Sequence, residues 1–393
     1  MHGVELLRGI DRFNHQHFYC MGYVAVKGGS DAIHQAKELV EFYRVKEQLP
    51  PVSAGQIRTQ MRLAVDKVIS EGGLYAPEYA AIALKQSEGD VFEAAFILRA
   101  FITTLQRRYY SETIDTRAMF IRRKISASFR EIPGGQVLGP TRDYTQRILD
   151  TTKVEETLSD IRDFLARFEA GINPARLQEL TSYGKVIDLL RHEGLLKPVG
   201  NAEDCTLKDI TREAIKFPAP RSARLQMMAR AETGGLMALG YSSLRGFGNT
   251  HPTVGELRYG TVALRVKDVR GRVRYIGKVE VTEAEMITTI KTDKKNSVPL
   301  YSIGYGLCFG QNDTKAICMG ILDRAMRSPE YGAPANDAEF VLYHTEGIEA
   351  MGFTNHLKLP HYVTFQASLS NVREAVRREN ANAAAAIEPE PVG

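Results

Sequence analysis

The chain has 393 residues, of which 44% are hydrophobic and 25% are charged, and its formal net charge is only +4. These values are typical of a globular protein of two or three domains, and the charge gives no argument for a nucleic-acid partner. The four cysteines have no paired spacing, and no apolar run approaches the roughly 20 residues of a membrane helix, which predicts a cytoplasmic protein with reduced thiols and no membrane span.

Residues 1–20 differ from the rest of the chain because they show no apolar periodicity that would anchor them to a core. They contain Arg8, Asp11 and Arg12 among their apolar residues, and they lack the continuous apolar region of a secretory signal peptide. We expect this segment to be a disordered extension and Met21 to be the functional start. Deleting residues 1–20 should then leave assembly and thermal stability unchanged.

Residues 21–200 are predicted to form a mainly helical domain. A short strand over 23–26 precedes two glycines, and a helix then begins at Ser30. Capping and helix-breaking residues indicate the later boundaries in this domain: Ser53 with Gln56, Gly72-Gly73, Pro77, and Asp90 with Glu93. Between residues 141 and 216 we expect helices broken at Gly171, Pro174, Gly194 and Pro198 to Gly200.

Residues 117–130 combine apolar residues with Arg122, Arg123 and Lys124. We interpret this stretch as a solvated basic face, with a contact to phosphate or to another subunit as the alternative. The loop over 132–140 contains three glycines and is expected to lead into a helix near Thr141. Backbone N–H groups at such a helix start can bind an anion, but the loop lacks the Lys-Ser/Thr of a Walker A motif, so this pattern alone does not define a phosphate site.

Residues 201–372 are predicted to form an α+β domain. A Met-rich helix opens at Arg221 and stops at Gly234-Gly235, and the glycine-rich stretch over 240–252 has the composition of a functional loop. Alternating apolar residues from Val262 to Val281 predict a β-hairpin. The remaining expectations are a helix after a capping box at Thr282 and Glu285, a strand over 301–309, a helix from Asn312, a helix over 337–350 and a strand over 362–367.

The C-terminal residues 373–393 are predicted to be the end of a last helix and a disordered, low-complexity tail. No internal repeat is visible along the chain. The overall fold class is therefore α+β, with a helical N-terminal part followed by a mixed part that contains an antiparallel hairpin.

Two histidines, His356 and His361, lie five positions apart. On a helix they would be roughly 140° apart, and on a strand they would point to opposite faces. A bend brings them together, and Pro360 between them favours one. The spacing is also found among zinc ligands, although a closed zinc site needs four. The alternative is that each histidine makes only a local hydrogen bond.

This bend belongs to a series of sequence blocks, which are Tyr23-Val-Ala-Val-Lys-Gly-Gly29, Glu71-Gly-Gly73, Ile132-Pro-Gly-Gly-Gln136 with Leu138-Gly-Pro-Thr141, His251-Pro252 with Gly255-Glu-Leu-Arg258, Asp337-Ala-Glu-Phe-Val-Leu-Tyr-His344, Glu349-Ala-Met-Gly-Phe353 and His356-Leu-Lys-Leu-Pro-His-Tyr-Val363. By the number and order of these blocks, residues 21 to about 372 resemble the I subunit of the bacterial carbon–phosphorus lyase system, the PhnI family.

The resemblance implies a reaction at the anomeric carbon of a ribose. The family's complex displaces the adenine of ATP with methylphosphonate, which gives α-D-ribose 1-methylphosphonate 5-triphosphate, and the I subunit alone acts as a nucleosidase on purine nucleoside triphosphates. The implied partners are the subunits PhnG, PhnH, PhnJ, PhnL and PhnK, with two copies of this chain in a larger core complex. The resemblance also implies that His356 and His361 hold a divalent metal ion, zinc, at the interface with the J subunit.

This chemistry requires particular residue types. Breaking an N-glycosidic bond develops positive charge on the sugar, which a carboxylate stabilises, and the purine leaves more easily when an acid protonates it. We expect Glu256 to be the carboxylate and His251 the acid, with structural hydrogen bonds or salt bridges as the alternative for both. The candidates for binding the triphosphate are Arg221, Arg224, Arg245 and Arg258. The alternative function is a non-catalytic scaffold subunit that lends its histidines to a partner's metal site.

Overall fold

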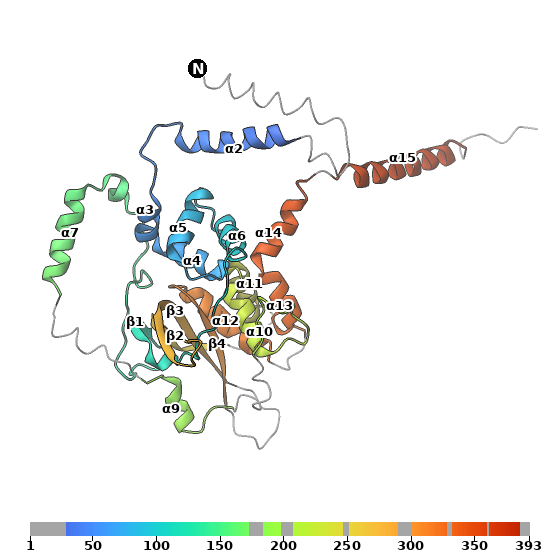
Figure 1. Ribbon diagram of the computed structural model, residues 1–393. Helices are drawn as coiled ribbons and strands as arrows, with labels where there is room; N and C mark the ends of the chain where they lie inside the picture. Colours follow the sequence, from blue (N-terminus) through green and yellow to red (C-terminus); the bar gives the residue numbers. More distant parts are fainter. Residues whose placement is uncertain are drawn as a thin grey trace, which may run out of the picture. The chain divides into compact units, whose positions relative to one another are not determined.

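The computed structural model describes residues 29–172, 184–197, 207–246, 251–289, 300–327, 332–359 and 361–385 (Figure 1). The chain divides into two compact units. One is Val52–Ala350, and the other combines Met1–Pro51 with Met351–Gly393. The boundary that we expected between residues 200 and 201 lies inside the first unit. Residues 1–20, Met21 and the expected strand over 23–26 lie outside the described residues.

Four helices build the N-terminal part of the larger unit: α3 (Ala54–Gln60), α4 (Arg62–Gly72), α5 (Pro77–Gln86) and α6 (Val91–Ile102). The capping box of Ser53 and Gln56 is confirmed, and Gly73 ends α4 in the left-handed conformation with φ 74°. The Asp90 side chain accepts the first free N–H groups of α6. Buried alanines, leucines and β-branched residues from all four helices form one apolar cluster, so the helical prediction for this part is confirmed.

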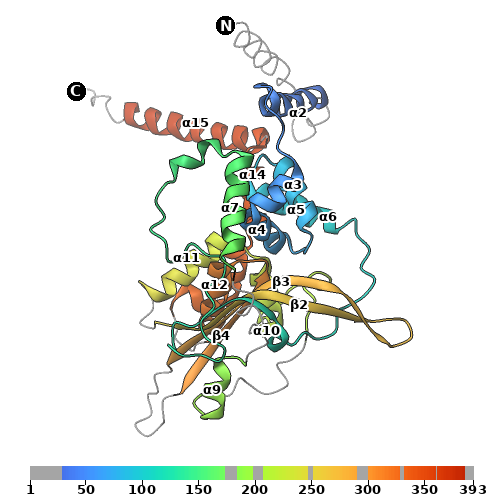
Figure 2. The same ribbon diagram turned by 90° about the vertical axis from the view of Figure 1, so that its left-hand side faces the viewer.

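Four antiparallel strands form one sheet in the order β1 (Phe120–Ile125), β2 (Thr253–Lys267), β3 (Val273–Thr289) and β4 (Tyr301–Phe309). The long β2–β3 hairpin extends from the rest of the unit, as Figure 2 shows. Both the predicted hairpin and the predicted strand over 301–309 are confirmed, and α12 (Asp313–Ala325) begins after Asn312 as expected.

Strand β1 corrects our interpretation of the basic stretch. Arg123 and Lys124 are each only 1% exposed, so neither belongs to a solvated basic face, whereas Arg122 lies at the surface and pairs with Glu280. The stretch is a strand because it pairs with β2, more than a hundred residues away in the sequence. Burial of both cations follows from that pairing, which places one on each face of the sheet.

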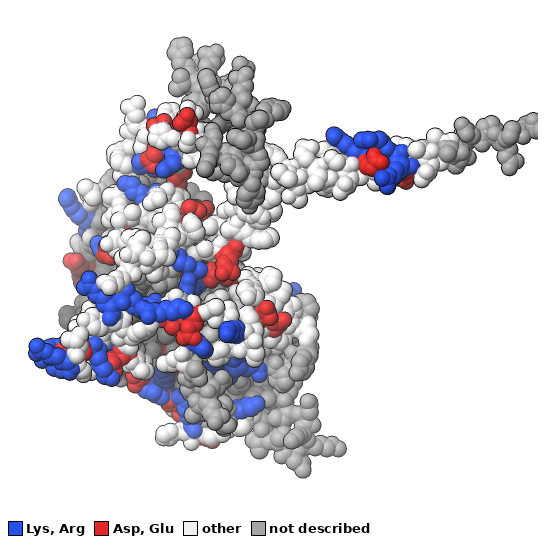
Figure 3. Space-filling model, turned by 45° about the vertical axis from the view of Figure 1, so that its right-hand side comes forward, with Lys and Arg blue, Asp and Glu red and all other residues white. Residues whose placement is uncertain are grey.

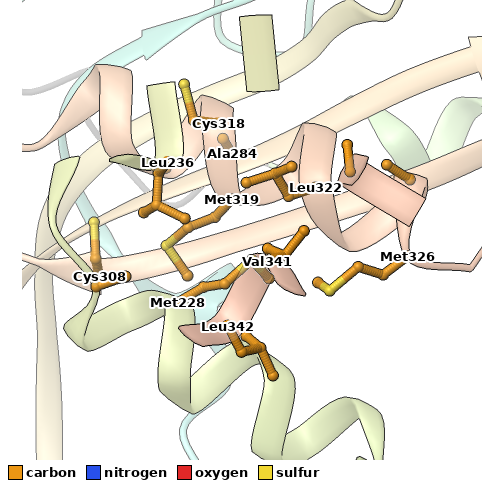
Figure 4. Packing of buried hydrophobic residues seen from close by; sticks show 14 of the residues in the cluster. Met228, Leu236, Ala284, Cys308, Cys318, Met319, Leu322, Met326, Val341 and Leu342 are labelled. Atoms are coloured by element: carbon orange, nitrogen blue, oxygen red, sulfur yellow. The ribbon is translucent and has the colours of Figure 1, made fainter. Parts of the chain in front are cut away.

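One face of the sheet, here called the helix face, carries Leu257, Ala284 and Cys308 and is covered by helices. The covering helices are α10 (Arg221–Arg230), α11 (Thr233–Leu244), α12 and α13 (Ala338–Thr345). Their inward side chains pack into a methionine-rich core around Met319, Met228 and Leu322 (Figure 4). The backbone of α12 lies directly on β4, because a Cβ atom at Gly304 or Gly306 would overlap the carbonyl oxygens of Gly320 or Ala316.

Several expected elements differ. The helix from Arg221 ends at Arg230, and Gly234 and Gly235 lie in the first turn of α11 because the Glu232 carboxylate accepts both of their N–H groups. No helix starts near Thr141 in this described stretch, and the Asp143 carboxylate there accepts a hydrogen bond from the buried Arg123. The expected helix over 337–350 is two helices, α13 and α14 (Gly347–His356), separated at Glu346.

The other elements of the larger unit are short or isolated: η2 (Thr116–Ala118), η3 (Thr151–Glu155), α7 (Leu158–Ala170), α9 (Ile187–His192) and η5 (Pro334–Asn336). The smaller unit contains α2 (Ser30–Val45), the end of α14 and α15 (Tyr362–Ala385). Within the described ranges, no helix is both long enough and apolar enough to cross a membrane.

Helix α15 replaces the strand that we expected over 362–367. Its first residues are β-formers, but they join a longer run that is rich in alanine and arginine and contains a Glu374–Arg378 pair at helical spacing. Figure 3 shows that the charged side chains of α15 gather beyond its first half. The helix continues to Ala385, and the last residues of the tail that we expected within 373–393 lie outside the described residues.

Candidate active site and candidate metal ligands

The other face of the sheet, here called the charged face, carries a buried group of ionisable side chains. Strand alternation and register bring them together, because Glu256 lies opposite Glu285 and Arg258 lies opposite both Glu283 and Lys124. Lys185 reaches the same group from the segment before α9. We call this group the carboxylate cluster, and its members are Lys124, Lys185, Glu256, Arg258, Glu283 and Glu285. Small apolar clusters around Ile287 and around Val281 lie on either side of it.

Glu283 is the fixed anion of the cluster. It pairs with Arg258, and it accepts hydrogen bonds from Lys185 Nζ at 2.8 Å and Tyr305 Oη at 2.8 Å. Thr116 Oγ1 donates a further bond at 2.7 Å. Burial disfavours the charged carboxylate, but Arg258 and Lys185 outweigh it and lower the pKa of Glu283 to about 2. Glu283 is therefore charged at neutral pH and anchors the two cations.

Glu256 is held less tightly. Its Oε2 accepts the Val186 N–H at 3.1 Å, and its nearest cations are Lys124 Nζ at 3.6 Å and Arg258 Nε at 3.9 Å. Among the described residues, its Oε1 has no hydrogen-bond partner. Burial raises the pKa of Glu256 against the opposing effect of the two cations, and burial lowers the pKa of Lys124. A carboxyl group with these properties can exchange a proton nearer neutrality than an ordinary glutamate.

Glu285 is a site residue that the sequence reading missed. It is 5% exposed, and its Oε1 accepts one bond, from Lys185 Nζ at 3.2 Å. Its Oε2 has no hydrogen-bond partner in the described part of the chain, and burial raises its pKa. We read Thr282 and Glu285 as a helix cap, but the apolar alternation of β3 continues past them. Because the alternation continues, Glu283 and Glu285 lie two positions apart on the same face of a strand. This pattern could have identified both glutamates as site residues.

The structure brings together two of the six residues that we expected at the nucleotide site, Glu256 and Arg258. His251 is exposed, two positions before β2. Arg221 binds the buried Asp323 carboxylate with Nε at 3.0 Å and Nη2 at 2.8 Å, on the helix face of the sheet. Arg245 follows α11 and donates to Tyr241 Oη at 3.2 Å, and Arg224 lies on α10. Arg221 and Arg258 therefore neutralise buried carboxylates in this state.

A cleft of about 250 Å³ lies at the edge of the sheet near Ile125, Val254 and Leu257. None of its described lining residues is charged. It therefore offers no group that would neutralise a triphosphate, and we do not assign the nucleotide site to it.

The geometry of His356 and His361 suits a pair of metal ligands. Their ring centroids are 5.3 Å apart, and both side chains are accessible. His356 Nδ1 contacts the Phe353 carbonyl oxygen, and His361 Nδ1 lies 2.6 Å from the Leu359 carbonyl oxygen. These contacts favour a proton on each Nδ1 and leave each Nε2 lone pair for a metal ion. Pro360 lies outside the described residues.

The described residues contain no group of three or more His, Cys, Asp or Glu side chains that could hold a metal ion. His344 is occupied in its own helix, where Nδ1 lies 2.8 Å from the Phe340 carbonyl oxygen and the ring stacks on Phe340. The two imidazoles of His356 and His361 therefore suit zinc, because nitrogen is a usual zinc ligand and each Nε2 has a lone pair to offer. Any further ligands would have to come from outside the described residues.

Comparison with known proteins places this geometry in context. A family model described as "Bacterial phosphonate metabolism protein (PhnI)" matches residues 22–380. A protein of Stutzerimonas stutzeri named "Putative C-P lyase subunit protein HtxH" is 45% identical over 359 residues, which is 90% of this chain and 95% of that protein. Two proteins named "Alpha-D-ribose 1-methylphosphonate 5-triphosphate synthase subunit PhnI" also match. The one from Rhizobium meliloti (strain 1021) is 42% identical over 91% of this chain and 95% of its own length, and the one from Escherichia coli (strain K12) is 43% identical over 91% and 99%.

Proposed function

The chain belongs to the PhnI family of bacterial phosphonate metabolism proteins, and from this membership we propose that it is a carbon–phosphorus lyase subunit that acts in making α-D-ribose 1-methylphosphonate 5-triphosphate. The observation that carries the proposal is 42% and 43% identity to the two synthase subunits over nearly their whole length. In this proposal the chain is a transferase that replaces the adenine of ATP with methylphosphonate, and on its own it hydrolyses purine nucleoside triphosphates.

The carboxylate cluster supports a role in this chemistry. The C1′–N9 bond breaks with positive charge developing on the ribosyl ring, and a buried carboxylate stabilises that charge more strongly than one in water. We assign this role to Glu256, which keeps one oxygen without a hydrogen bond to any described residue. His251 remains the candidate acid from the sequence, and Arg245 is the most exposed of the candidate phosphate contacts.

We also propose that His356 and His361 bind zinc at a contact with the J subunit. When bound, the metal ion supplies Lewis acidity and a positive charge at that interface. This chain contributes two Nε2 atoms whose orientation is set by the Nδ1 contacts to backbone carbonyl groups. The remaining ligands would come from the partner. PhnG, PhnH, PhnL and PhnK are the other partners in this proposal, with two copies of the chain in the complex.

The decisive experiment measures base release. The purified chain is incubated with ATP or GTP and free purine is quantified by chromatography. Addition of the G, H and L subunits and methylphosphonate should divert the reaction to ribose 1-methylphosphonate 5-triphosphate, which phosphorus NMR detects. Glu256→Gln should lower kcat far more than it raises KM, because the carboxylate acts mainly in the transition state. Absence of base release by the chain alone, with unchanged product formation by a complex containing Glu256→Gln, would favour the scaffold alternative.

The metal proposal is tested separately by measuring zinc in the purified complex. His356→Ala and His361→Ala should each remove most of the zinc, because one imidazole holds the ion weakly. Base release by the chain alone should survive in both variants. Unchanged zinc content would refute the assignment, and loss of base release would show that the two sites are one.

A further inference from the structure

We propose that Glu285 is a second reacting carboxylate, paired with Glu256 across β2 and β3, and that it is the acid that protonates the departing purine. This inference rests on the proposed function, because it assumes that a ribosyl group reacts at the carboxylate cluster. It assigns to Glu285 the role for which His251 was the candidate from the sequence.

The first argument is the register of the strands. Glu256 and Glu285 are direct partners in the β2–β3 ladder, and their side chains point to the charged face. Directly opposed residues have Cβ atoms about 4.5–5.5 Å apart. Two carboxylates at this separation, both buried, share one proton readily, because two adjacent negative charges in a dry environment are unfavourable. His251 is exposed and lies outside the ladder.

The second argument is a set of polar atoms that make no hydrogen bond within the described part of the chain, although Lys124 Nζ lies 3.6 Å from one of them, Glu256 Oε1. Glu256 Oε1, Glu285 Oε2 and Arg258 Nη1 are all buried and make no hydrogen bond to any described residue. Buried polar atoms are almost always hydrogen-bonded in folded proteins, so three such atoms in one cluster indicate a place where another molecule binds. Two acceptors and one donor suit a ribosyl group with hydroxyl groups that can both donate and accept.

The third argument decides which acid carries the proton. Glu256 has two cations nearby, Lys124 and Arg258, and the Val186 N–H as a further donor. Glu285 has one cation within ion-pair distance, Lys185 Nζ at 3.2 Å, and Lys185 lies closer still to Glu283, at 2.8 Å. The two cations of Glu256 lie at 3.6 and 3.9 Å. From this difference in the number of neighbouring donors, the proposal places the proton on Glu285 and the negative charge on Glu256.

The reaction step then balances. The C1′–N9 bond breaks and its electron pair leaves with the purine, which takes the Glu285 proton on a ring nitrogen. Water forms the new bond to C1′ and gives a proton to Glu256, and this proton returns to Glu285 across the strand pair. With methylphosphonate as the nucleophile, its anionic oxygen forms the bond, and solvent returns the proton to Glu285.

The segment over residues 184–187 controls access to Glu256 and Glu285, because it covers them. Residues 184–187 lie over the cluster, where the Val186 N–H binds Glu256 and the Gly184 carbonyl accepts from Lys124 Nζ at 3.2 Å. Glu256 and Glu285 are only 2% and 5% exposed, so the proposal requires this segment to move aside when the nucleotide enters. The contacts that it loses are then replaced by contacts from the substrate.

The test compares base release by the full chain, or by its complex, in Glu285→Gln and in the matched control Glu280→Gln. Glu280 is on the same strand and pairs with Arg122, but it faces the opposite side of the sheet. Glu285→Gln should lower kcat by about 10²–10⁴-fold, the range of general acid catalysis, and Glu280→Gln should not. The fall in wild-type rate at high pH, where the acid is deprotonated, should disappear in Glu285→Gln. A structural role would not remove it.

A change of the leaving group distinguishes the role of Glu285 from that of Glu256. An N7-methylated purine nucleoside triphosphate needs no protonation, so it should restore most of the rate of Glu285→Gln and not that of Glu256→Gln. Equal kcat in Glu285→Gln and Glu280→Gln would overturn the proposal. If Glu285→Gln does not fold, Glu285→Asp decides, and a loss below tenfold would overturn it. Failure of the wild-type chain and complex to release any base would instead refute the proposed function.

Discussion

Asp66 on α4 allows a direct test of how burial of a carboxyl group changes its pKa and the stability of this protein. Its Oδ2 accepts the Gln311 N–H at 3.1 Å, and Arg62 Nη1 is 3.6 Å away. Burial raises the pKa of Asp66 from 3.8 to about 6, in spite of both contacts. Each pKa unit corresponds to about 1.4 kcal/mol, so the buried charge costs about 3 kcal/mol at neutral pH. We predict that Asp66→Asn, which keeps an acceptor for Gln311, stabilises the chain by up to about 3 kcal/mol at pH 8.

The sign follows from linkage. A carboxyl group whose folded pKa is raised contributes stability that is fully present below pH 3.8 and is lost as pH rises through about 6. The difference in unfolding free energy between Asp66→Asn and wild type should therefore be near zero around pH 4 and reach its full value by pH 7. Urea unfolding across this range measures it, with Asp163→Asn on the exposed helix α7 as the control. A variant that is less stable than wild type at pH 8 would show that the ion pair with Arg62 outweighs burial.

The remaining predictions concern packing, capping and charge. Gly306→Ala should destabilise the chain by at least about 3 kcal/mol, because the new Cβ overlaps the Ala316 carbonyl oxygen, whereas Gly352→Ala, with open space around it, should be neutral or slightly stabilising in the same thermal melts. Ser53→Ala should cost about 1 kcal/mol through loss of the cap on α3, and an unchanged melting temperature would mean that α3 is held by packing alone. Glu283→Gln should cost about 3–5 kcal/mol because Arg258 and Lys185 lose their main counter-charge. In wild type, the contribution of Glu283 is fully present above its ordinary pKa of 4.5 and is lost as pH falls through about 2, which acid titration of the two proteins compares.

Local signals in the sequence predicted the elements that local forces build. The cap at Ser53, the glycine after α4 and the cap at Asp90 each act within one helical turn, so the helices beside them were predicted closely. The β2–β3 hairpin is equally local, because its two strands are neighbours in sequence. Strand β1 was missed because its partner β2 is distant in sequence, and nothing within residues 117–130 distinguishes a buried arginine from a solvated one.

The candidate site was predicted only in part for the same reason. Glu256 and Arg258 are two positions apart, so any strand through them places both on one face. Their neighbours Lys124 and Lys185 come from distant segments, and only the tertiary fold shows that they meet there. Glu285 was assigned to a helix cap because Thr-x-x-Glu fits both a capping box and the middle of a strand. The closeness of His356 and His361 was predicted because only four residues separate them in the sequence.

The direct contact between α12 and β4 has a mechanical consequence. Where Gly304 and Gly306 meet Gly320 and Ala316, peptide groups touch without an intervening layer of side chains. No side chain lies between the two backbones, so a change of rotamer cannot accommodate a shift of α12 relative to β4. Helix and strand therefore move together as one rigid body. The charged face is instead held by polar contacts that water can replace. Amide hydrogens of α12 and β4 should therefore exchange more slowly with deuterium than those around residues 184–187.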